Sequence, residues 1–580
     1  MKKTFLLLCL SLAGFGGFAQ TSRTLSLPFF DDFAKFNNRL DTTLWEDGSS
    51  VYVNNQFSRN PVSKNIATFN SFSAAGNLST VSSTQKTGVD TLTSRPINLS
   101  GFSASDSVYL SFYLQLGGIG LVPGTSSYFQ VEFLNNLGVW QSASARIFRG
   151  SQSADQFTQY FIPITDAKFF HNNFQFRFRS YGESRPRFDT WNLDYVYLNA
   201  KRQKNERRVD ITTSRPITSL LQRYTAMPIH QFQANIAGEL NDSVYTTLNN
   251  LEDQQRNITS TTTVQIGNGT PATIAVNPIA IAAFARQYRE FPNSPNQSIF
   301  ANLSGPQDVK TTVTVDTQEP TDSPTLYNDT ISGVTPLRDY YAYDDGSPET
   351  VINIPRTNPG SLFQMGQKYF LNQNDQVKKL SFYVPKGNNT PGTIVTFRIW
   401  NAKPSGEPDG NSIFSQTYTV PPLAQLDTWV DIPVNPPVTV SGSFFAGWTI
   451  PSGSATFSTG FDLNHNAPRY FNATNTWLPE NNGAVMVRVY MGNHVTGIEE
   501  SNFAAKKLLL YPNPATSSVT IQGEFDEVKL LTITGQQVLA KNGTGAETQV
   551  DVSKLTPGIY LVQIRKKDQV QTQKLIIQPN

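Results

Sequence analysis

Paired carboxylates are the first residues of this sequence that could do chemistry. The pairs are Asp31 with Asp32, Glu46 with Asp47, and Asp344 with Asp345. Two carboxylates about 5–10 Å apart across a cleft could hydrolyse a glycosidic bond. Acidic residues are also common in turns and at strand edges, where they accept hydrogen bonds from the backbone. The pairs therefore leave open an extracellular polysaccharide-degrading enzyme as one alternative.

Other catalytic constellations are absent from the sequence. It has no G-x-S-x-G or H-E-x-x-H motif and no glycine-rich loop for phosphates or dinucleotides. The lone cysteine is Cys9, and the histidines are scattered over His171, His230, His465 and His494. We expect each histidine to be a surface or loop residue, and the sequence assigns no catalytic residue.

Aromatic side chains, which form 12% of the sequence, are a second group of candidate functional residues. Trp and Tyr rings combine an apolar face with a polar atom, which suits stacking against sugars. Tyr109 and Tyr113 lie opposite the apolar side of a predicted strand, and Trp477 lies in a polar stretch. These three are the candidate ligand-binding residues. Other tryptophans are expected in cores: Trp191, Trp400 and Trp448.

The composition excludes several classes of protein. Charged residues are 16% of the 580, against about 25% in an average soluble protein. Lys and Arg number 46 and Asp and Glu number 44, so the chain lacks the positive charge that nucleic-acid binding requires. β-branched and aromatic residues with abundant Gly, Pro and Asn disfavour a helical bundle or a coiled coil. The apolar content of 38% is too high for a disordered chain.

The N-terminus has the pattern of a secretory signal peptide, residues 1–19. Lys2 and Lys3 precede a short apolar run, and Ala19 stands before the expected cleavage at Gln20. The run is shorter than the ~20 residues that cross a membrane, and no other stretch is apolar enough to span one. Cleavage would remove the cysteine and both lysines, which leaves 44 basic residues (46 − 2) against 44 acidic ones.

Alternation of apolar and polar residues predicts antiparallel strands in the remaining chain. Residues 108–116, 128–134 and 174–179 alternate in this way. Sheets with one buried face and one solvent-exposed face are typical of a β-sandwich. The predicted fold class is therefore all-β and multidomain, with about 100–200 residues per domain.

Four domains are expected after the signal peptide, over residues 20–200, 201–337, 338–495 and 496–580. A basic polar run at 201–208 favours a solvated linker. The second domain has the strand spacing of an immunoglobulin-like spacer. The third has repeated strand and turn signals and is expected to be a second jelly-roll-like sandwich.

Three motifs in the first domain carry a resemblance to a known family: FFDDF at 29–33, DTLTSRPINLS at 90–100 and WNLDYVYL at 191–198. Together with Trp45, they resemble jelly-roll domains of the MAM and concanavalin-A-like kind, especially those of exported Bacteroidetes proteins. Animal MAM domains carry cysteines that this segment lacks, so their pairing does not transfer.

This resemblance implies a structural calcium ion, because such jelly rolls often hold one on acidic and carbonyl oxygens. One ligand set would come from the first and last strands, which commonly pair: Asp31 or Asp32 with Asp194. A second would join a turn to later residues: Asp344–Gly346 with Asp462 or Asn464. Calcium is the one cofactor that the sequence suggests.

The last segment holds the most specific motifs. Two prolines form a turn after the first strand, and Gly–Gln and Pro–Gly pairs form the turns of later hairpins. In order and spacing the segment closely resembles the type A C-terminal sorting domain of the type IX secretion system. The matching residues include Tyr511, Pro512, Asn513, Pro514, Ala515, Gly535, Gln536, Gly558, Tyr560 and Lys574.

The resemblance implies a route and a set of partners. The type IX secretion machinery would carry the protein from the periplasm across the outer membrane, and a sortase-like peptidase would remove the tail near residues 496–507. The passenger would then be released or attached to surface lipopolysaccharide. The expected location is therefore the outer cell surface or the medium.

The function that we expect is binding without catalysis, either in adhesion or in recognition of polysaccharide. The partner would be an extracellular polysaccharide or a surface protein, and not a nucleic acid. Two alternatives remain open at this point: a polysaccharide-degrading enzyme with an unrecognised carboxylate site, and a structural surface stalk or matrix component.

Overall fold

The structure is a computed structural model of the 580-residue chain. It describes residues 24–47, 50–70, 72, 83–148, 154–184, 188–206, 208–292, 297–300, 303, 305–352, 362–387, 389–450, 456–473, 476–492, 509–522, 525–532, 536–543, 547–566 and 569–579. The predicted signal peptide, with Ala19 and Gln20, and the turn residue Gly535 lie outside this part. The chain divides into two compact units, Met1–Asn493 and His494–Asn580.

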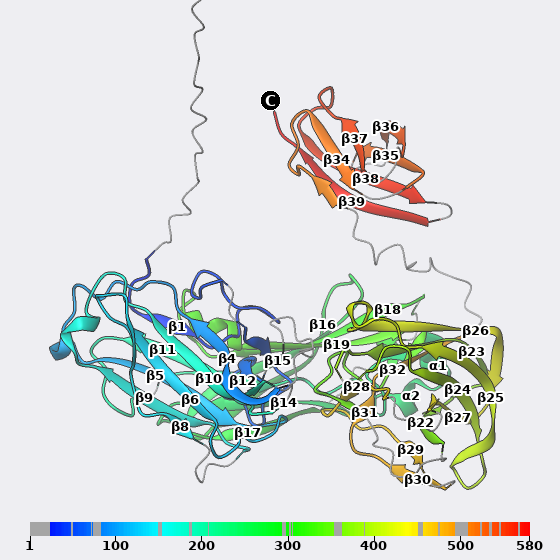
Figure 1. The fold of residues 1–580 in the computed structure, drawn as a ribbon, viewed down its shortest axis with the longest axis horizontal. Coiled ribbons are helices and arrows are strands. Elements are labelled where there is room, and N and C mark those ends of the chain that lie inside the picture. The colour runs from blue at the N-terminus through cyan, green and yellow to red at the C-terminus, as the bar shows by residue number, and fades with distance from the viewer. Residues whose placement is uncertain are drawn as a thin grey trace, which may run out of the picture. The chain divides into compact units, whose positions relative to one another are not determined.

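The first unit begins with a sandwich of two antiparallel sheets, drawn in blue to cyan in Figure 1. One sheet has the order β2-β3-β11-β5-β9, with β1 paired to β11: β1 Phe29–Asp31, β2 Tyr52–Asn54, β3 Ile66–Phe69, β5 Val108–Leu116, β9 Thr158–Ile164 and β11 Trp191–Asn199. The other has the order β4-β10-β6-β7, with β8 paired to β6: β4 Ser83–Thr93, β6 Tyr128–Leu134, β7 Trp140–Ser142, β8 Ile147–Phe148 and β10 Phe176–Ser184.

The core of this sandwich is built from the apolar sides of the alternating strands. Phe112 of β5, Phe129 of β6, Phe178 of β10 and Trp191 of β11 have no exposed surface and pack in one cluster. Burial of each large apolar side chain stabilises the fold by about 1.5–3 kcal/mol. The first strand pairs with the last, because β1 lies against β11 with Asp31 opposite Val196.

The basic run after the sandwich is less solvated than its composition indicates. Arg202 is 4% exposed, and its guanidinium lies 4.2 Å from the centre of the Tyr197 ring. Its Nη1 donates to the carbonyl oxygens of Tyr109 and Tyr197. The aliphatic stem of arginine and its flat cation suit an aromatic surface, so this segment covers the outer face of the sheet.

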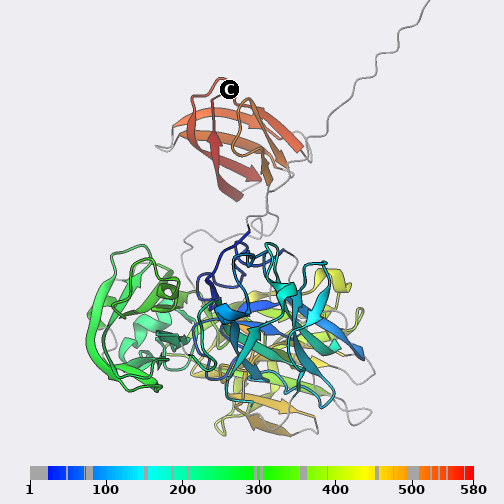
Figure 2. The same ribbon diagram turned by 90° about the vertical axis from the view of Figure 1, so that its left-hand side faces the viewer.

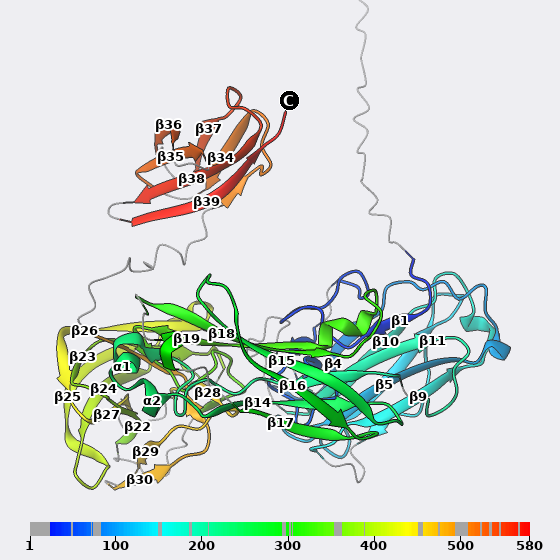
Figure 3. The same ribbon diagram turned by 180° about the vertical axis from the view of Figure 1, so that it is seen from behind.

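The middle segment contains two sheets, drawn in green in Figure 3. The smaller has the order β12-β14-β17: β12 Ile211–Arg215, β14 Ser243–Asn250 and β17 Arg286–Pro292. The larger has the order β13-β19-β18-β15-β16: β13 Met227–Pro228, β15 Arg256–Ile266, β16 Ala272–Ile281, β18 Gln307–Asp316 and β19 Thr330–Arg338. Short helical elements also occur: α1 Ile229–Ala234, α2 Ile236–Glu239 and the 3-10 turn η4 Pro324–Asn328.

The third segment has three antiparallel sheets. One has the order β20-β32-β23-β26: β20 Tyr340–Tyr341, β23 Asp375–Val384, β26 Thr428–Val440 and β32 Val487–Met491. The next has the order β21-β28-β31: β21 Thr350–Ile352, β28 Thr459–Asp462 and β31 Ala484–Val485. The last has the order β25-β24-β27-β22-β29-β30: β22 Phe363–Phe370, β24 Ile394–Ala402, β25 Pro408–Thr419, β27 Ser443–Ile450, β29 Arg469–Asn472 and β30 Trp477–Glu480.

The middle and third segments share one continuous core. Tyr224 of the middle segment packs against Tyr341 and Tyr343, with ring centroids 4.8 and 4.7 Å apart. Its hydroxyl donates to the carbonyl oxygen of Phe370 at 3.1 Å. Buried residues from both segments therefore form a single cluster across residue 337, the position at which we expect a domain boundary.

The second unit is a small sandwich. One sheet has the order β33-β34-β37: β33 Leu509–Tyr511, β34 Ser518–Gln522 and β37 Glu547–Asp551. The other has the order β36-β35-β38-β39: β35 Glu527–Thr532, β36 Gln537–Asn542, β38 Gly558–Lys566 and β39 Gln569–Ile577. With these sheets the chain is all-β and multidomain, as the sequence predicts.

The YPNPA turn of the tail, residues 511–515, holds the last strand in place. Asn513 donates from Nδ2 to the carbonyl oxygen of Lys574 at 2.8 Å and accepts from the backbone N of Ile576 at 2.9 Å. Two residues later, the N–H of the fully buried Ala515 donates to the carbonyl oxygen of Ile576. The YPNPA and KLII motifs, far apart in the sequence, thus form one structural contact.

Replacement of Asn513 by Ala is expected to destabilise the second unit by about 1–2 kcal/mol, because two hydrogen bonds to β39 are lost at an exposed position. Urea unfolding of the second unit, residues 494–580, would measure this cost. Asn542→Ala, at the end of β36, is the matched control and should change the midpoint little. Equal midpoints for the two variants would show that Asn513 does not hold β39.

Candidate functional site

A polar cleft of about 960 Å³ is formed where three parts of the first unit meet. Residues within 55–61 contribute from the first sandwich. Residues 215–219 and 333–336 contribute from the middle segment, and residues within 340–345 and 463–465 from the third. Sites of this size suit small ligands or a short stretch of a polymer.

The side chains that line the cleft are mostly hydroxyls, amides and charged groups. The hydroxyl and amide groups come from all three parts: Asn55, Gln56, Ser58, Asn60, Thr218, Ser219 and Asn464. Tyr245 and Tyr340 add aromatic rings. Amides and hydroxyls both donate and accept hydrogen bonds, so the lining can bond to the hydroxyls of a ligand.

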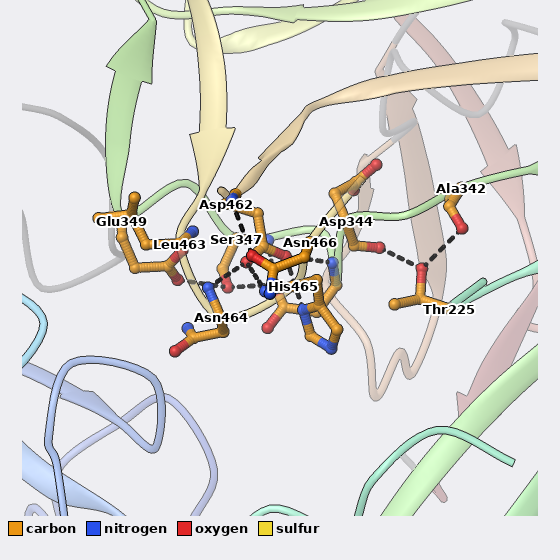
Figure 4. Close-up of polar contacts among 12 residues, drawn as sticks. Thr225, Ala342, Asp344, Ser347, Glu349, Asp462, Leu463, Asn464, His465 and Asn466 are labelled. Carbon is orange, nitrogen blue, oxygen red and sulfur yellow. Dashed lines mark hydrogen bonds and ion pairs between the residues drawn. The ribbon is translucent and has the colours of Figure 1, made fainter. Parts of the chain in front are cut away.

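One edge of the cleft is organised by Asp462, which ends β28 and has no exposed surface. Its Oδ1 accepts from the backbone N–H groups of Asn464 at 2.7 Å and His465 at 3.0 Å. Its Oδ2 lies 2.9 Å from both the backbone N of Asp345 and the Nδ1 of His465. Figure 4 shows Asp462, Asn464 and His465 gathered at this turn. A carboxylate that bonds to the backbone two residues on is typical of such turns.

The titratable groups here shift each other's pKa. Burial alone would lower the pKa of His465. The hydrogen bond and negative charge of Asp462, together with the negative charges of Asp345 and Asp344, raise it to about 9. Burial, with the charge of Asp462, raises the pKa of Asp345 to about 6. Burial also raises the pKa of Glu349, whose Oε2 accepts from the N of Leu463, well above its usual range. At neutral pH the cleft therefore holds an imidazolium beside a carboxylate.

The charges that line the cleft balance each other. Arg488 lies 3.3 Å from the buried Asp344, and Arg59 lies 3.1 Å from Asp155. His465 is paired with Asp462. The lining also contains one further cation and one further carboxylate, Arg215 and Asp345. Because the two signs are matched, the electrostatics favour a neutral ligand over a strongly anionic or cationic one.

The His465–Asp462 pair is expected to stabilise the first unit in a pH-dependent way. The pKa of His465 rises from 6.5 to about 9 on folding, so its contribution is full below pH 6.5 and is lost as the pH rises through 9. After allowance for its partial exposure, we expect about 1–2 kcal/mol. The free energy of unfolding of the protein and of His465→Gln should therefore differ at pH 6 and converge near pH 10. A difference independent of pH would exclude this pair as its source.

The predicted second calcium set partly coincides with this turn. Within the described part of the chain, Asp345, Asp462 and His465 are the one set of three such residues whose donor atoms lie within 4.8 Å of one another. The four hydrogen bonds to Asp462 already come from protein groups, so the geometry is that of an ion pair in a turn. His465 was not expected here, and its only signal in the sequence is its place three residues after an aspartate. Calcium at this turn stays a prediction.

The first predicted calcium set is buried in the first sandwich. Asp31 accepts from Trp45 Nε1 at 2.6 Å, Asp32 from the N–H of Ala34 at 3.0 Å, and Asp194 from the N–H of Ser63 at 2.9 Å. Burial raises the pKa of Asp31 to about 7 and of Asp32 to about 6, and that of Asp194 well above its usual range. These carboxylate oxygens already accept hydrogen bonds from protein groups. A calcium ion held by this set stays a prediction.

The three candidate ligand-binding aromatics do not line the cleft. Trp477 lies on the edge strand β30, half-buried, with its ring 5.7 Å from that of the buried Trp400. Tyr113 packs edge-to-face against Tyr195 at 6.1 Å, and the backbone oxygen of Tyr109 accepts from Arg202. Sugar binding by these residues stays a prediction. The acidic pair Glu46 and Asp47 lies near Arg95, at 3.9 and 3.8 Å.

Comparison with known families identifies the second unit. Residues 509–578 match the family model of the secretion system C-terminal sorting domain. The tail is therefore of the sorting-domain class, as the sequence resemblance indicates. More particularly it is a tail of the type IX secretion system, and the protein is exported to the cell surface or secreted. Among the described residues, no helix is long and apolar enough to cross a membrane.

The remaining comparisons show low similarity. No curated protein matches the chain. The GH2 β-galacturonidase from Eisenbergiella tayi bound to galacturonate is 11% identical over 55% of this chain and 45% of its own, with a TM-score of 0.21. The CBM22-1–CBM22-2 tandem domain from Paenibacillus barcinonensis Xyn10C is 8% identical over 80% of this chain and 98% of its own, with a TM-score of 0.18. The chain spans less than half the length of the first solved structures that it matches.

Proposed function

We propose that the protein is an exported binding protein whose cleft takes a neutral, hydroxyl-rich ligand, namely a stretch of extracellular polysaccharide. The observation that carries the proposal is the lining of the cleft, in which hydroxyl and amide side chains predominate and charges of opposite sign are paired. Its export supports a ligand outside the cell.

The physical fit rests on complementarity of hydrogen bonds. A sugar carries hydroxyls that donate and accept, and an amide such as Asn60 or Asn464 can satisfy both roles at once. Both residues are exposed in the cleft. The Nδ2 of Asn60 donates to the carbonyl oxygen of Asp155 at 3.0 Å, so its Oδ1 and its second N–H are the groups that can bond to a ligand. Tyr245 and Tyr340 supply rings against which a sugar ring can pack.

A glycan array probed with the full-length protein would test this function. We expect binding to a limited set of neutral polysaccharides, and no signal above background anywhere on a broad array would contradict it. Incubation with each bound polysaccharide should release no reducing ends. The raised pKa of Asp345 in the cleft is what favours the enzymatic alternative. Release of reducing ends that Asp345→Asn abolishes would overturn the non-catalytic assignment.

A further inference from the structure

The two sheets of the first sandwich have different surroundings. The sheet that contains β11 faces the middle segment, which lies beside the sandwich in Figure 2, and the Tyr195 hydroxyl donates to Asp210 Oδ2 across this contact. The other sheet, which contains β6 and β10, has its outer face on the opposite side, since the two sheets pack face to face. Alternate residues of its strands reach this outer face, which we call the arginine face: Tyr128 and Glu132 of β6, Arg177, Arg179 and Tyr181 of β10, and Arg146 beside β8.

A stack of flat groups on the arginine face has one open end. Tyr128 and Tyr181 are opposite each other on neighbouring strands, and their rings lie 15° from parallel with centroids 4.7 Å apart. The guanidinium of Arg146 lies 4.2 Å from the centre of the Tyr128 ring, and it must cover the second side of that ring because Tyr181 fills the first. Among the described residues, no ring or cation covers the second side of Tyr181 in this way. That side can therefore take a ligand with a flat apolar surface.

The space beside the open side of Tyr181 exists because Gly88 of β4 is the residue opposite it. A Cβ atom at Gly88 would lie 2.9 Å from Nη2 of Arg179. The arginine head thus lies above the glycine, next to the open side of the tyrosine ring. A larger side chain in place of Gly88 would occupy this space.

Arg179 also has hydrogen-bond donors to offer. Arg177, two residues earlier, is engaged: its Nε lies 2.5 Å from Glu132 Oε2, and its guanidinium lies 4.2 Å from the centre of the Trp140 ring. The nearest carboxylate atom to Arg179 is Glu132 Oε1 at 3.8 Å from Nη1, which is too long for a hydrogen bond. Its side chain is 41% exposed, and its guanidinium makes no hydrogen bond to a described residue.

Positive charge predominates on the described part of the arginine face. Its three guanidinium groups surround one carboxylate, Glu132, because the other acidic residue of β10, Glu183, lies opposite Lys86. This surplus favours an anionic ligand, whereas the charges of the cleft are matched. The whole chain has only 46 basic residues against 44 acidic ones, so it offers no extended positive surface for the phosphates of a nucleic acid.

We propose that the arginine face binds an acidic polysaccharide, with one uronate unit packed on the open side of Tyr181 and its carboxylate held by Arg179. The C–H side of a sugar ring supplies the apolar surface that a tyrosine ring accepts. The guanidinium fork matches a carboxylate with two parallel N–H···O bonds. This site is separate from the cleft, and the proposal holds whether or not the cleft binds a neutral ligand.

Calorimetric titration of the full-length protein with alginate and with polygalacturonate, whose units are all uronates, would test this site. An esterified form of each polymer, in which the carboxylates are neutral, should bind at least tenfold more weakly than the acidic form. Arg179→Ala should weaken binding of the acidic form by about tenfold or more, because bonds to a charged group are lost. Arg39→Ala, an exposed arginine in the loop after β1, is the matched control and should bind as the unmodified protein does.

A second variant fills the open space without removing a binding group. Gly88 is exposed, and its backbone has no positive φ, so Gly88→Val should be tolerated in the strand and should keep Tm while it weakens binding about tenfold. The proposal is overturned if neither acidic polymer binds, if the esterified forms bind equally well, or if Gly88→Val binds normally. Equal losses in Arg39→Ala and Arg179→Ala would show general attraction of charge and no site. Tighter binding of single-stranded DNA than of either polymer would make a nucleic acid the occupant and would likewise refute the proposal.

Discussion

Deletion of residues 494–580 is expected to abolish surface display and secretion and to leave the protein in the periplasm. The deleted part is the compact unit that contains the sorting domain, residues 509–578. The rest of the chain has its own cores and should fold without it, so the effect should be on transport and not on stability. Fractionation of cells that express each form, followed by detection of the protein in periplasm, surface and medium, would measure the outcome.

The control for this experiment is a full-length chain with the exposed Asn542 replaced by Ala, which should be exported normally. Asn513→Ala, which loosens the last strand, should fall between the two if the sorting domain is recognised as a folded unit. Unchanged surface display after the deletion would contradict the assignment of the tail.

Loss of ligand affinity in the cleft is the second large effect that we expect. Arg215→Ala and Asn464→Ala remove exposed side chains that line the cleft, so the fold should be retained. Each lost hydrogen bond should cost about 1.5 kcal/mol, which is about tenfold in Kd, and a charged donor such as Arg215 should cost more. Titration of the polysaccharide that the glycan array identifies would give the affinities.

Two further variants separate the cleft from other sites. Asn277→Ala, on β16 and outside the cleft, is the matched control and should bind as the unmodified protein does. Trp477→Ala tests the aromatic site that the sequence suggests. If Trp477→Ala abolishes binding and the cleft variants leave it intact, the ligand lies on the edge strand β30 and the cleft is not its site.

The sequence predicts the strands well because their signal is local. The apolar residues Leu110, Phe112 and Leu114 alternate with polar ones, and in the structure they are fully buried. The strands and turns of the tail can be predicted equally well, because its prolines and glycines mark turns at fixed spacing. The sequence does not predict helices α1 and α2, because elements of six and four residues are too short for a helical periodicity to be recognised.

The cleft could not be predicted for a different physical reason. Asp345 and Asp462 are 117 residues apart, and their contact depends on how β28 packs against its neighbours. The place of His465 three residues after Asp462 is the one local signal that it belongs to this turn, and it gives no sign that Asp345 joins them. The shared core across residue 337 cannot be predicted from the sequence for the same reason, because Tyr224 and Tyr341 form their contact only in the folded chain.

That shared core has a consequence for cooperativity. A fragment that ends at residue 337 would leave the faces around Tyr224 and Leu337 without their partners and open to water, so it should be prone to aggregate. In the whole protein, the middle and third segments should lose their structure in a single calorimetric transition. We therefore predict that the two segments behave as one folding unit, so that a substitution in the core of either, such as Tyr341→Ala, should destabilise both.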